Sequence, residues 1–225
     1  MVPSSLRARH AASTISFVGR RAVVAGGTSG IGRGAALRLA EAGFSVSVLG
    51  RSAVAGGEAV EAMRAVGAPG SHHRFIPFDG FSLASVRAAA SEVTRELDGA
   101  PLDVLFLSQG MATLQGRTET VDGLDEKLSL HVYSRVALTL ALIPSLRLAI
   151  SPRVISVLSA GVHGVYTHWR TDPELRTHYS IPIAADAAGL LNDACLDGLS
   201  REPENQRILF VHAAPGIVST NWGCE

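Results

Sequence analysis

The sequence predicts an α/β fold in which helices cover both faces of a doubly wound parallel sheet, giving three layers. Two observations predict it. Short apolar runs alternate with helical patterns along the chain, and the first run ends in a glycine-rich turn that leads into a helix. Strands flanked by helices in this way imply right-handed βαβ units and a sheet buried on both faces. Ligands of such sheets bind at the carboxyl ends of the strands.

Each element follows from a local pattern. Apolar runs predict strands over residues 21–25, 45–49, 74–78, 102–107, 154–158 and 208–212. Helical spacing predicts helices that begin near Gly30 and then span residues 54–66, 83–97, 124–150 and 183–199. Ser82 is the expected N-cap of the helix over 83–97, and we expect the long helix over 124–150 to kink at Pro144.

Composition predicts one globular domain over residues 20–225, preceded by an arm over residues 1–19. The chain has 225 residues, of which 47% are hydrophobic and 18% charged. Its formal net charge of zero gives no reason to expect nucleic acid as a partner. Cys195 and Cys224 form no metal or disulfide pattern, and no apolar run approaches the length of a membrane span.

The first residues have two interpretations. No acidic residue precedes Glu41, while the first 21 residues are rich in arginine and serine, as in a mitochondrial transit peptide. The alternative is a short surface arm ahead of the first strand. We expect the surface arm and a cytoplasmic protein, with a mitochondrial location as the alternative.

The turn over residues 26–32 predicts a dinucleotide site. A strand before it and a helix after it aim backbone N–H groups and the positive helix end at one point, where a phosphate can bind. Glycine is needed there because a side chain would block the tight turn and the approach of the ligand.

The end of the second predicted strand favours NADP(H) over NAD(H). NAD sites usually place an acid there to bind the ribose hydroxyls, but this stretch reads Gly50-Arg51-Ser52. The Arg51 guanidinium suits a ribose 2′-phosphate, and Arg33 can assist it. The alternative is a solvated surface arginine.

With these motifs, residues 20–221 resemble the short-chain dehydrogenase/reductase family, and fungal-type reductases within it. The family motif Thr-Gly-x-x-x-Gly-x-Gly appears with Ala25 in the first place, and Pro-Gly-x-x-x-Thr begins at Pro215. The Asn-Asn-Ala-Gly segment keeps only its glycine, Gly110. The resemblance implies a Rossmann-like fold and an NADP(H) site formed by Gly26, Thr28, Ser29, Gly30, Ile31, Gly32, Arg33, Arg51, Asp79 (at the adenine), Ser108, Gly110, Pro215, Gly216 and Thr220.

The resemblance also implies a catalytic set of Asn, Ser, Tyr and Lys. Ser159, after the fifth strand, matches the serine that polarises the substrate oxygen; a strand-end hydroxyl bonded to its own backbone is the alternative. Lys127 is the only lysine and precedes the serine, so Tyr-x-x-x-Lys cannot occur. Tyr179 is better separated from Ser159 than Tyr166 and is the expected proton donor.

Two residues around this set depart from the family pattern. Pro182 suits a first helical turn, so we expect the helix to start near it and Tyr179 to lie just outside. His131 stands where the family has asparagine. It is either a proton relay supporting catalysis or a helix histidine bonded inside the core. The eight histidines show no metal-ligand spacing.

The expected function is NADP(H)-dependent oxidation or reduction of an alcohol or carbonyl in a small lipophilic molecule. One alternative is a catalytically impaired NADP(H)-binding pseudoenzyme, a sensor or scaffold, and another is a non-redox isomerase or cyclase. The chain ends five residues after Thr220, so we expect the last strand and helix of the family to be missing. A partner subunit covering that sheet edge would make a homo-oligomer.

Overall fold

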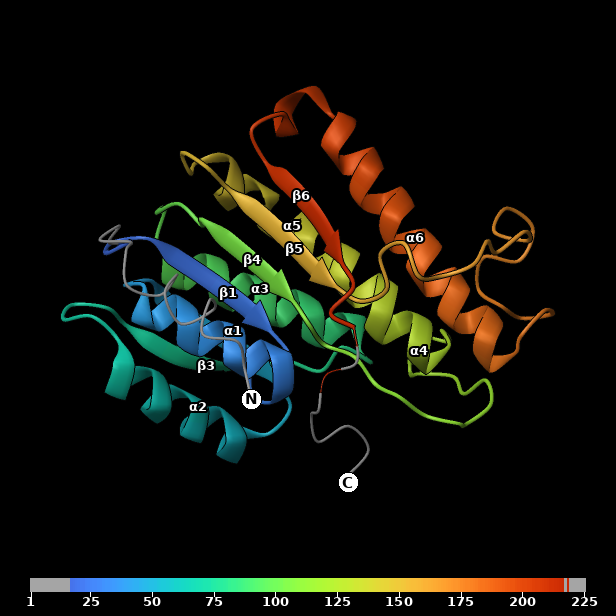
Figure 1. Cartoon of the computed structure of the whole chain (residues 1–225), viewed down its shortest axis with the longest axis horizontal. Helices are drawn as coiled ribbons and strands as arrows, with labels where there is room; N and C mark the ends of the chain where they lie inside the picture. Colours follow the sequence, from blue (N-terminus) through green and yellow to red (C-terminus); the bar gives the residue numbers. More distant parts are fainter. Residues whose placement is uncertain (1–16, 217, 219–225) are drawn as a thin grey trace, which may run out of the picture.

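The sheet has six parallel strands. The computed structural model describes residues 17–216 and residue 218 (Figure 1). The strands are β1 (Arg21–Ala25), β2 (Ser45–Gly50), β3 (His73–Pro77), β4 (Val104–Leu107), β5 (Arg153–Val157) and β6 (Leu209–Ala213). Their order is β3-β2-β1-β4-β5-β6, and every neighbouring pair is parallel. The order reverses between β1 and β4, where doubly wound sheets bind their ligands.

Helices cover both faces and make the predicted three layers. One face packs against α1 (Gly30–Glu41) and α2 (Ala53–Val66). The other packs against α3 (Leu83–Leu97), α5 (Ser134–Arg147) and α6 (Ile181–Arg201). Three short helical segments remain in the described part of the chain: α4 (Glu126–Leu128), the π-helical turn η3 (Ser129–Tyr133) and the 3₁₀ turn η4 (Pro203–Asn205).

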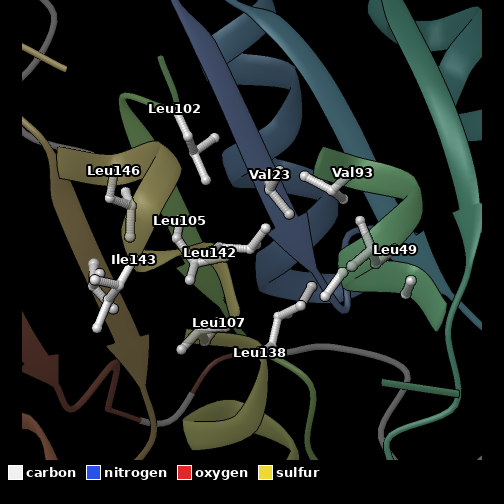
Figure 2. Packing of buried hydrophobic residues seen from close by; sticks show 14 of the residues in the cluster. Val23, Leu49, Val93, Leu102, Leu105, Leu107, Leu138, Leu142, Ile143 and Leu146 are labelled. Carbon is white, nitrogen blue, oxygen red and sulfur yellow. The ribbon is translucent and has the colours of Figure 1, made fainter. Parts of the chain in front are cut away.

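The core lies between the sheet and the larger helical layer. Alternation along β1 sends Val23 toward α3 and α5, while Ala22 and Val24 face α1 and α2. Figure 2 shows the leucines of β4 and α5 meeting Val23 and Leu49 across this interface. The strands are therefore buried on both sides, as the continuous apolar runs predict.

Several local predictions are confirmed. β1 and α3 have the predicted bounds, and the Ser82 side chain accepts a hydrogen bond from the Ser85 N–H at 3.3 Å as the N-cap of α3. β4 is shorter than predicted, because the Leu102 N–H donates to the Ser145 carbonyl of α5 before the ladder begins. The long helix is irregular at η3, and α5 continues past Pro144 to Arg147.

One helical stretch corrects the expectation about apolar runs. By length and composition alone, Glu126–Arg147 could cross a membrane, with a mean hydropathy of 1.2 over its most apolar window. Of that window, 61% is buried inside the protein, and Leu138, Leu142 and Leu146 are fully buried in the core. The stretch packs as a core helix, and a buried helix is apolar for the same reason as a membrane span.

Candidate cofactor and active site

The glycine turn is closed by contacts that leave no room for side chains. Gly26 has φ +74°, and a Cβ there would lie 2.6 Å from the backbone nitrogen of Gln109. A Cβ on Gly32 would lie 2.2 Å from the Gly26 carbonyl oxygen and 2.3 Å from Ser108 Oγ. Real Cβ atoms do not approach so closely, so these glycines bring β1, β4 and the start of α1 together.

The start of α1 is suited to an anion. Ser29 is the N-cap residue, but its side chain makes no capping hydrogen bond, and the first turn of the helix contains no acidic residue. A helix N-terminus carries partial positive charge and aims its first N–H groups outward. This end of α1 lines a cleft, and a phosphate bound there would satisfy those N–H groups.

The cleft has a volume of about 850 Å³ and runs along the carboxyl ends of the strands. This volume lies within the range of roughly 300–1,000 Å³ that small-molecule sites usually have. Its walls come from the turns that follow all six strands and from the helical region around α4 and η3. They include Gly26, Thr28, Ser29, Gly30, Ile31, Gly32, Arg51, Ser108, Gly110 and Pro215 from the predicted cofactor residues.

Arg51 lies at the end of β2 and lines the cleft. Its guanidinium carbon is 5.5 Å from the centroid of the Phe81 ring, which lines the same wall. Arg51 is flanked by Gly50 and Ser52. Neither neighbour is the acidic residue that binds the ribose hydroxyls in NAD sites. Arg33, by contrast, is half-buried in the first turn of α1 and does not line the cleft.

Other predicted cofactor residues are held by the backbone. Ser108 Oγ donates to the Ala25 carbonyl at 3.0 Å, which ties the end of β4 to the glycine turn. Asp79 Oδ1 accepts the Phe81 N–H at 3.0 Å, and the carboxylate does not line the cleft. Gly216 has φ +70° and is exposed. Thr220 lies outside the described residues.

Ser159 lies in the turn after β5, beyond the cleft lining. Its Oγ is buried and has no hydrogen-bond partner among the described residues. Its backbone N–H donates to Nε2 of His212, on β6, at 3.1 Å. Most buried hydroxyls are paired, so an unpaired one beside a cleft is a candidate contact for a ligand.

Tyr179 lies outside α6, as Pro182 predicts. α6 begins at Ile181, and the Ser180 side chain accepts the Ile183 N–H at 3.3 Å as its N-cap. The Tyr179 hydroxyl lies 3.4 Å from the carbonyl oxygen of Gln115, which lines the cleft. Tyr179 itself does not line the cleft, but its hydroxyl contacts the backbone of a residue that does. Tyr166 is different, because it is buried and its hydroxyl donates to the Asp172 carbonyl.

The structure brings Lys127 to Tyr179. Lys127 Nζ lies 5.4 Å from the centroid of the Tyr179 ring and donates to the Gly116 carbonyl at 3.1 Å. Asp125 Oδ2 lies 4.0 Å from the same Nζ atom. Lysine and tyrosine thus meet, although they are 52 positions apart in the sequence. The ammonium group lies over the face of the ring, a cation–π contact.

His131 lies in η3 and is bonded inside the protein. Its Nε2 accepts the Met111 N–H at 3.0 Å. Burial first, and then the charges of Arg135 and Lys127, lower the pKa of His131 to about 3. The ring is therefore neutral near pH 7. These contacts agree with the alternative of a bonded core histidine, and nothing in them supports a proton relay.

Sequence reasoning missed two buried residues that join the strand ends. Arg135 lines the cleft and is 2% exposed, and it donates to the Gln109 carbonyl, the Val157 carbonyl and Ser156 Oγ. Burial lowers its pKa to about 9. Asn192 of α6 donates to the His131 carbonyl at 2.7 Å and accepts from Ser156 Oγ at 3.0 Å. The apolar periodicity of the helices could not identify these two residues, because ordinary core or surface residues also occur at such positions.

Comparisons with known proteins agree with this geometry. A family model described as short chain dehydrogenase matches residues 20–170. Polyprenol dehydrogenase of Mus musculus is 39% identical over 215 residues, which cover 90% of this chain and 61% of that protein. Oxidoreductase AN1596 of Emericella nidulans is 30% identical over 202 residues, which cover 89% of this chain and 59% of that protein. The chain therefore spans about three fifths of the length of these curated relatives.

Solved structures share the fold. The Pseudomonas aeruginosa RhlG/NADP active-site complex is 25% identical, has a TM-score of 0.68, and is matched over 92% of this chain and 76% of that one. A metagenomic short-chain oxidoreductase in complex with NADP has a TM-score of 0.71 over 92% of this chain and 84% of that one. Its identity of 20% makes it a likeness of fold alone.

Proposed function

The chain belongs to the short-chain dehydrogenase family, and from this premise we propose that it is an NADP(H)-dependent oxidoreductase. Its substrate is a carbonyl or alcohol of a small lipophilic molecule. The observation that carries the proposal is one cleft lined by both the uncapped start of α1 and Arg51. The two features bind negative charge at separate points, as a dinucleotide with an additional phosphate requires.

The residues divide the work. The N–H groups at the start of α1 bind the pyrophosphate, and the Arg51 guanidinium binds the 2′-phosphate. A nicotinamide cofactor, when bound, supplies or accepts the hydride. The Ser159 hydroxyl donates a hydrogen bond to the substrate oxygen, and the Tyr179 hydroxyl, beside the Gln115 backbone, gives or takes the proton. His131 supports this site by holding the Met111 backbone in the cleft wall.

The cleft and its surroundings favour a lipophilic substrate. Met111, Ala112 and Leu158 contribute apolar surface to the lining. Leu114, which lies between the lining residues Thr113 and Gln115, is 90% exposed to solvent. Exposed apolar side chains at the mouth of a cleft are typical of sites for apolar ligands. A relative named polyprenol dehydrogenase makes isoprenoid alcohols and aldehydes a sensible first set of substrates.

A second candidate function is NADP(H) binding without turnover, in a sensor or scaffold. Contacts of Lys127 favour it: Nζ is bonded to the Gly116 carbonyl and lies over the ring of Tyr179. In the family pattern a lysine follows the tyrosine by four residues and supports the phenol. Here that position is Ile183, in the first turn of α6.

Turnover distinguishes the two functions. We expect the purified protein to bind NADPH and to consume it with isoprenoid aldehydes and other lipophilic carbonyls, followed by absorbance. Tyr179→Phe should lower kcat by about a hundredfold or more, the usual contribution of a proton donor, and leave the Kd for NADPH unchanged. Tyr133→Phe is the matched control, because that hydroxyl has no hydrogen bond to the described residues.

The other outcomes are equally informative. NADPH binding with no turnover on the panel supports the non-enzymatic function. Product formation without any nicotinamide cofactor indicates isomerase or cyclase chemistry in the same cleft. Absence of binding to both NADPH and NADH overturns the oxidoreductase and the sensor together.

A further inference from the structure

Asp193 of α6 contacts two histidines from different elements. Asp193 Oδ2 lies 2.8 Å from Nε2 of His163, in the loop after β5. Asp193 Oδ1 lies 2.7 Å from Nδ1 of His212, on β6. The His163 and His212 side chains are 11% and 5% exposed, and their rings stack with centroids 6.3 Å apart. We call these three residues the His-Asp-His cluster.

The partners of His212 determine where its proton lies. His212 Nε2 accepts the Ser159 N–H, so this nitrogen carries no hydrogen. The hydrogen of the neutral ring is then on Nδ1, from which it is donated to Asp193. His212 thus links the Asp193 carboxylate to the backbone of Ser159 only in this one neutral form.

The partners of His163 require the protonated, positively charged form of its ring. Its Nε2 faces the Asp193 carboxylate, and its Nδ1 faces the Gly164 carbonyl at 3.0 Å. Both partners are acceptors, so both ring nitrogens must donate, which only the imidazolium can do. The hydrogen bond to Gly164, followed by the one to Asp193, raises the pKa of His163. The cluster therefore balances one positive and one negative charge.

Packing against α6 holds the His163 loop in place. A Cβ on Gly189 would lie 2.4 Å from the His163 ring, so the ring fits there only because residue 189 is glycine. The Gly164 N–H donates to Asp186 Oδ1 at 2.6 Å. The charged and titratable groups in this region are thus the three members of the cluster and Asp186 of α6, which faces His163.

We propose that the His-Asp-His cluster positions Ser159: His212 holds the Ser159 backbone N–H, and His163, while charged, holds the loop after β5 against α6. The proposal rests on the proposed function, because it takes Ser159 as the residue that binds the substrate oxygen. Deprotonating His163 leaves the Gly164 carbonyl or Asp193 without its donor and weakens the attachment of the loop to α6.

Two substitutions of His212 separate positioning from general stability. His212→Gln keeps an acceptor near the Ser159 N–H, so kcat should fall less than threefold. His212→Asn keeps a donor toward Asp193 but loses the acceptor for Ser159. Its kcat should fall roughly ten- to a hundredfold, as for a slightly misplaced catalytic group, while the Kd for NADPH stays unchanged. Equal losses in both variants would overturn the positioning role.

His163→Gln tests the alkaline limb. The amide can donate to Asp193 but has no charge to lose, so the decrease in kcat at high pH should be absent. His72→Gln is the matched control, because His72 is exposed at the start of β3, far from α6 in the sequence and outside the cluster. Retention of the wild-type alkaline limb in His163→Gln would contradict the role of His163.

A readout independent of turnover keeps this test separate from that of the proposed function. Imidazole ¹⁵N NMR of the purified protein near pH 7 should show His212 as the Nδ1–H tautomer and His163 as an imidazolium. The Ser159 amide signal should shift in His212→Asn, which removes the acceptor, and stay close to its wild-type position in His212→Gln. An Nε2–H tautomer at His212, or a neutral His163, overturns the cluster even if the enzyme is active. A protein with no turnover but with these signals retains the cluster and loses only the proposed function.

Discussion

Individual residues at the ends of β1 and β2 underlie the proposed preference for NADP(H). The glycines of the turn allow close approach of a ligand, which every nicotinamide dinucleotide needs. Arg51, in the cleft lining, is the group that we propose to distinguish a ribose 2′-phosphate from a hydroxyl. We therefore expect this side chain to decide the preference between NADPH and NADH, and the backbone of the turn to decide whether a dinucleotide binds at all.

Arg51→Ala tests this separation. Removing a charge-assisted hydrogen bond of about 1.5–3 kcal/mol should weaken NADPH binding by at least tenfold and leave NADH binding within twofold. Titration of both cofactors by fluorescence or calorimetry gives the two Kd values. Arg64→Ala is the control, because Arg64 is an exposed arginine of α2 paired with Glu61. An unchanged ratio of the two Kd values in Arg51→Ala would refute the phosphate role.

At the scale of elements, the segment between β5 and α6 is organised by one carboxylate. Asp172 accepts the backbone N–H groups of Arg176, Thr177 and His178, and also His178 Nδ1. This loop carries Tyr179 at its end. A loop without regular structure thus places the phenol through a set of local hydrogen bonds, which the sequence pattern did not reveal.

Asp172 should make stability depend on pH. Burial by itself raises the pKa of Asp172, but the hydrogen bonds from His178, Thr177 and Arg176 together lower it below its ordinary value. A carboxyl with a lowered folded-state pKa stabilises the protein above the unfolded value of about 3.9, and this stability is lost as the pH falls. Urea unfolding across pH 3–7 should therefore show a steeper acid loss in the wild type than in Asp172→Asn.

The same variant should be less stable at pH 7, because the amide cannot accept all four hydrogen bonds. Asp197→Asn is the matched control on α6, since it breaks only an exposed ion pair with Arg201. If Asp172→Asn and Asp197→Asn unfolded at the same urea concentration at every pH, the organising role of Asp172 would be wrong.

For the whole molecule, one core joins the sheet to α3, α5 and α6. Leu142 of α5 is fully buried in it (Figure 2). Leu140, two residues earlier, is 52% exposed. The pair lies on opposite sides of the same helix. The helix that is apolar enough to resemble a membrane span is thus divided into a buried face and an exposed one.

Substituting each leucine measures how much the core contributes. Leu142→Ala should lower the free energy of unfolding by about 2–5 kcal/mol, because it removes buried methyl groups and leaves a cavity. Leu140→Ala should change it by less than about 0.5 kcal/mol. Guanidinium unfolding followed by circular dichroism gives both values. Similar losses in the two variants would show that α5 is not packed as described.

Most of the fold could be predicted because its signals are local. The apolar run of β1, the N-cap Ser82 and the position of Pro182 each act over a few residues, and the structure confirms them. The start of β4 was harder to predict, because the Leu102 N–H donates to the distant Ser145 carbonyl and the strand begins only at Val104. The π-helical turn η3 was missed for another reason: its one extra residue leaves the spacing of the apolar residues almost unchanged.

The sequence by itself determined the parallel sheet, the glycine turn, Arg51 beside it and the absence of a Tyr-x-x-x-Lys pair. Only the tertiary structure decided which side chains meet: Lys127 with Tyr179, and Asp193 with His163 and His212. The physical reason is that backbone propensity and apolar periodicity depend on neighbours a few residues apart. These pairs instead depend on how α4, α6 and β6 pack against one another, and that packing is set by the whole core.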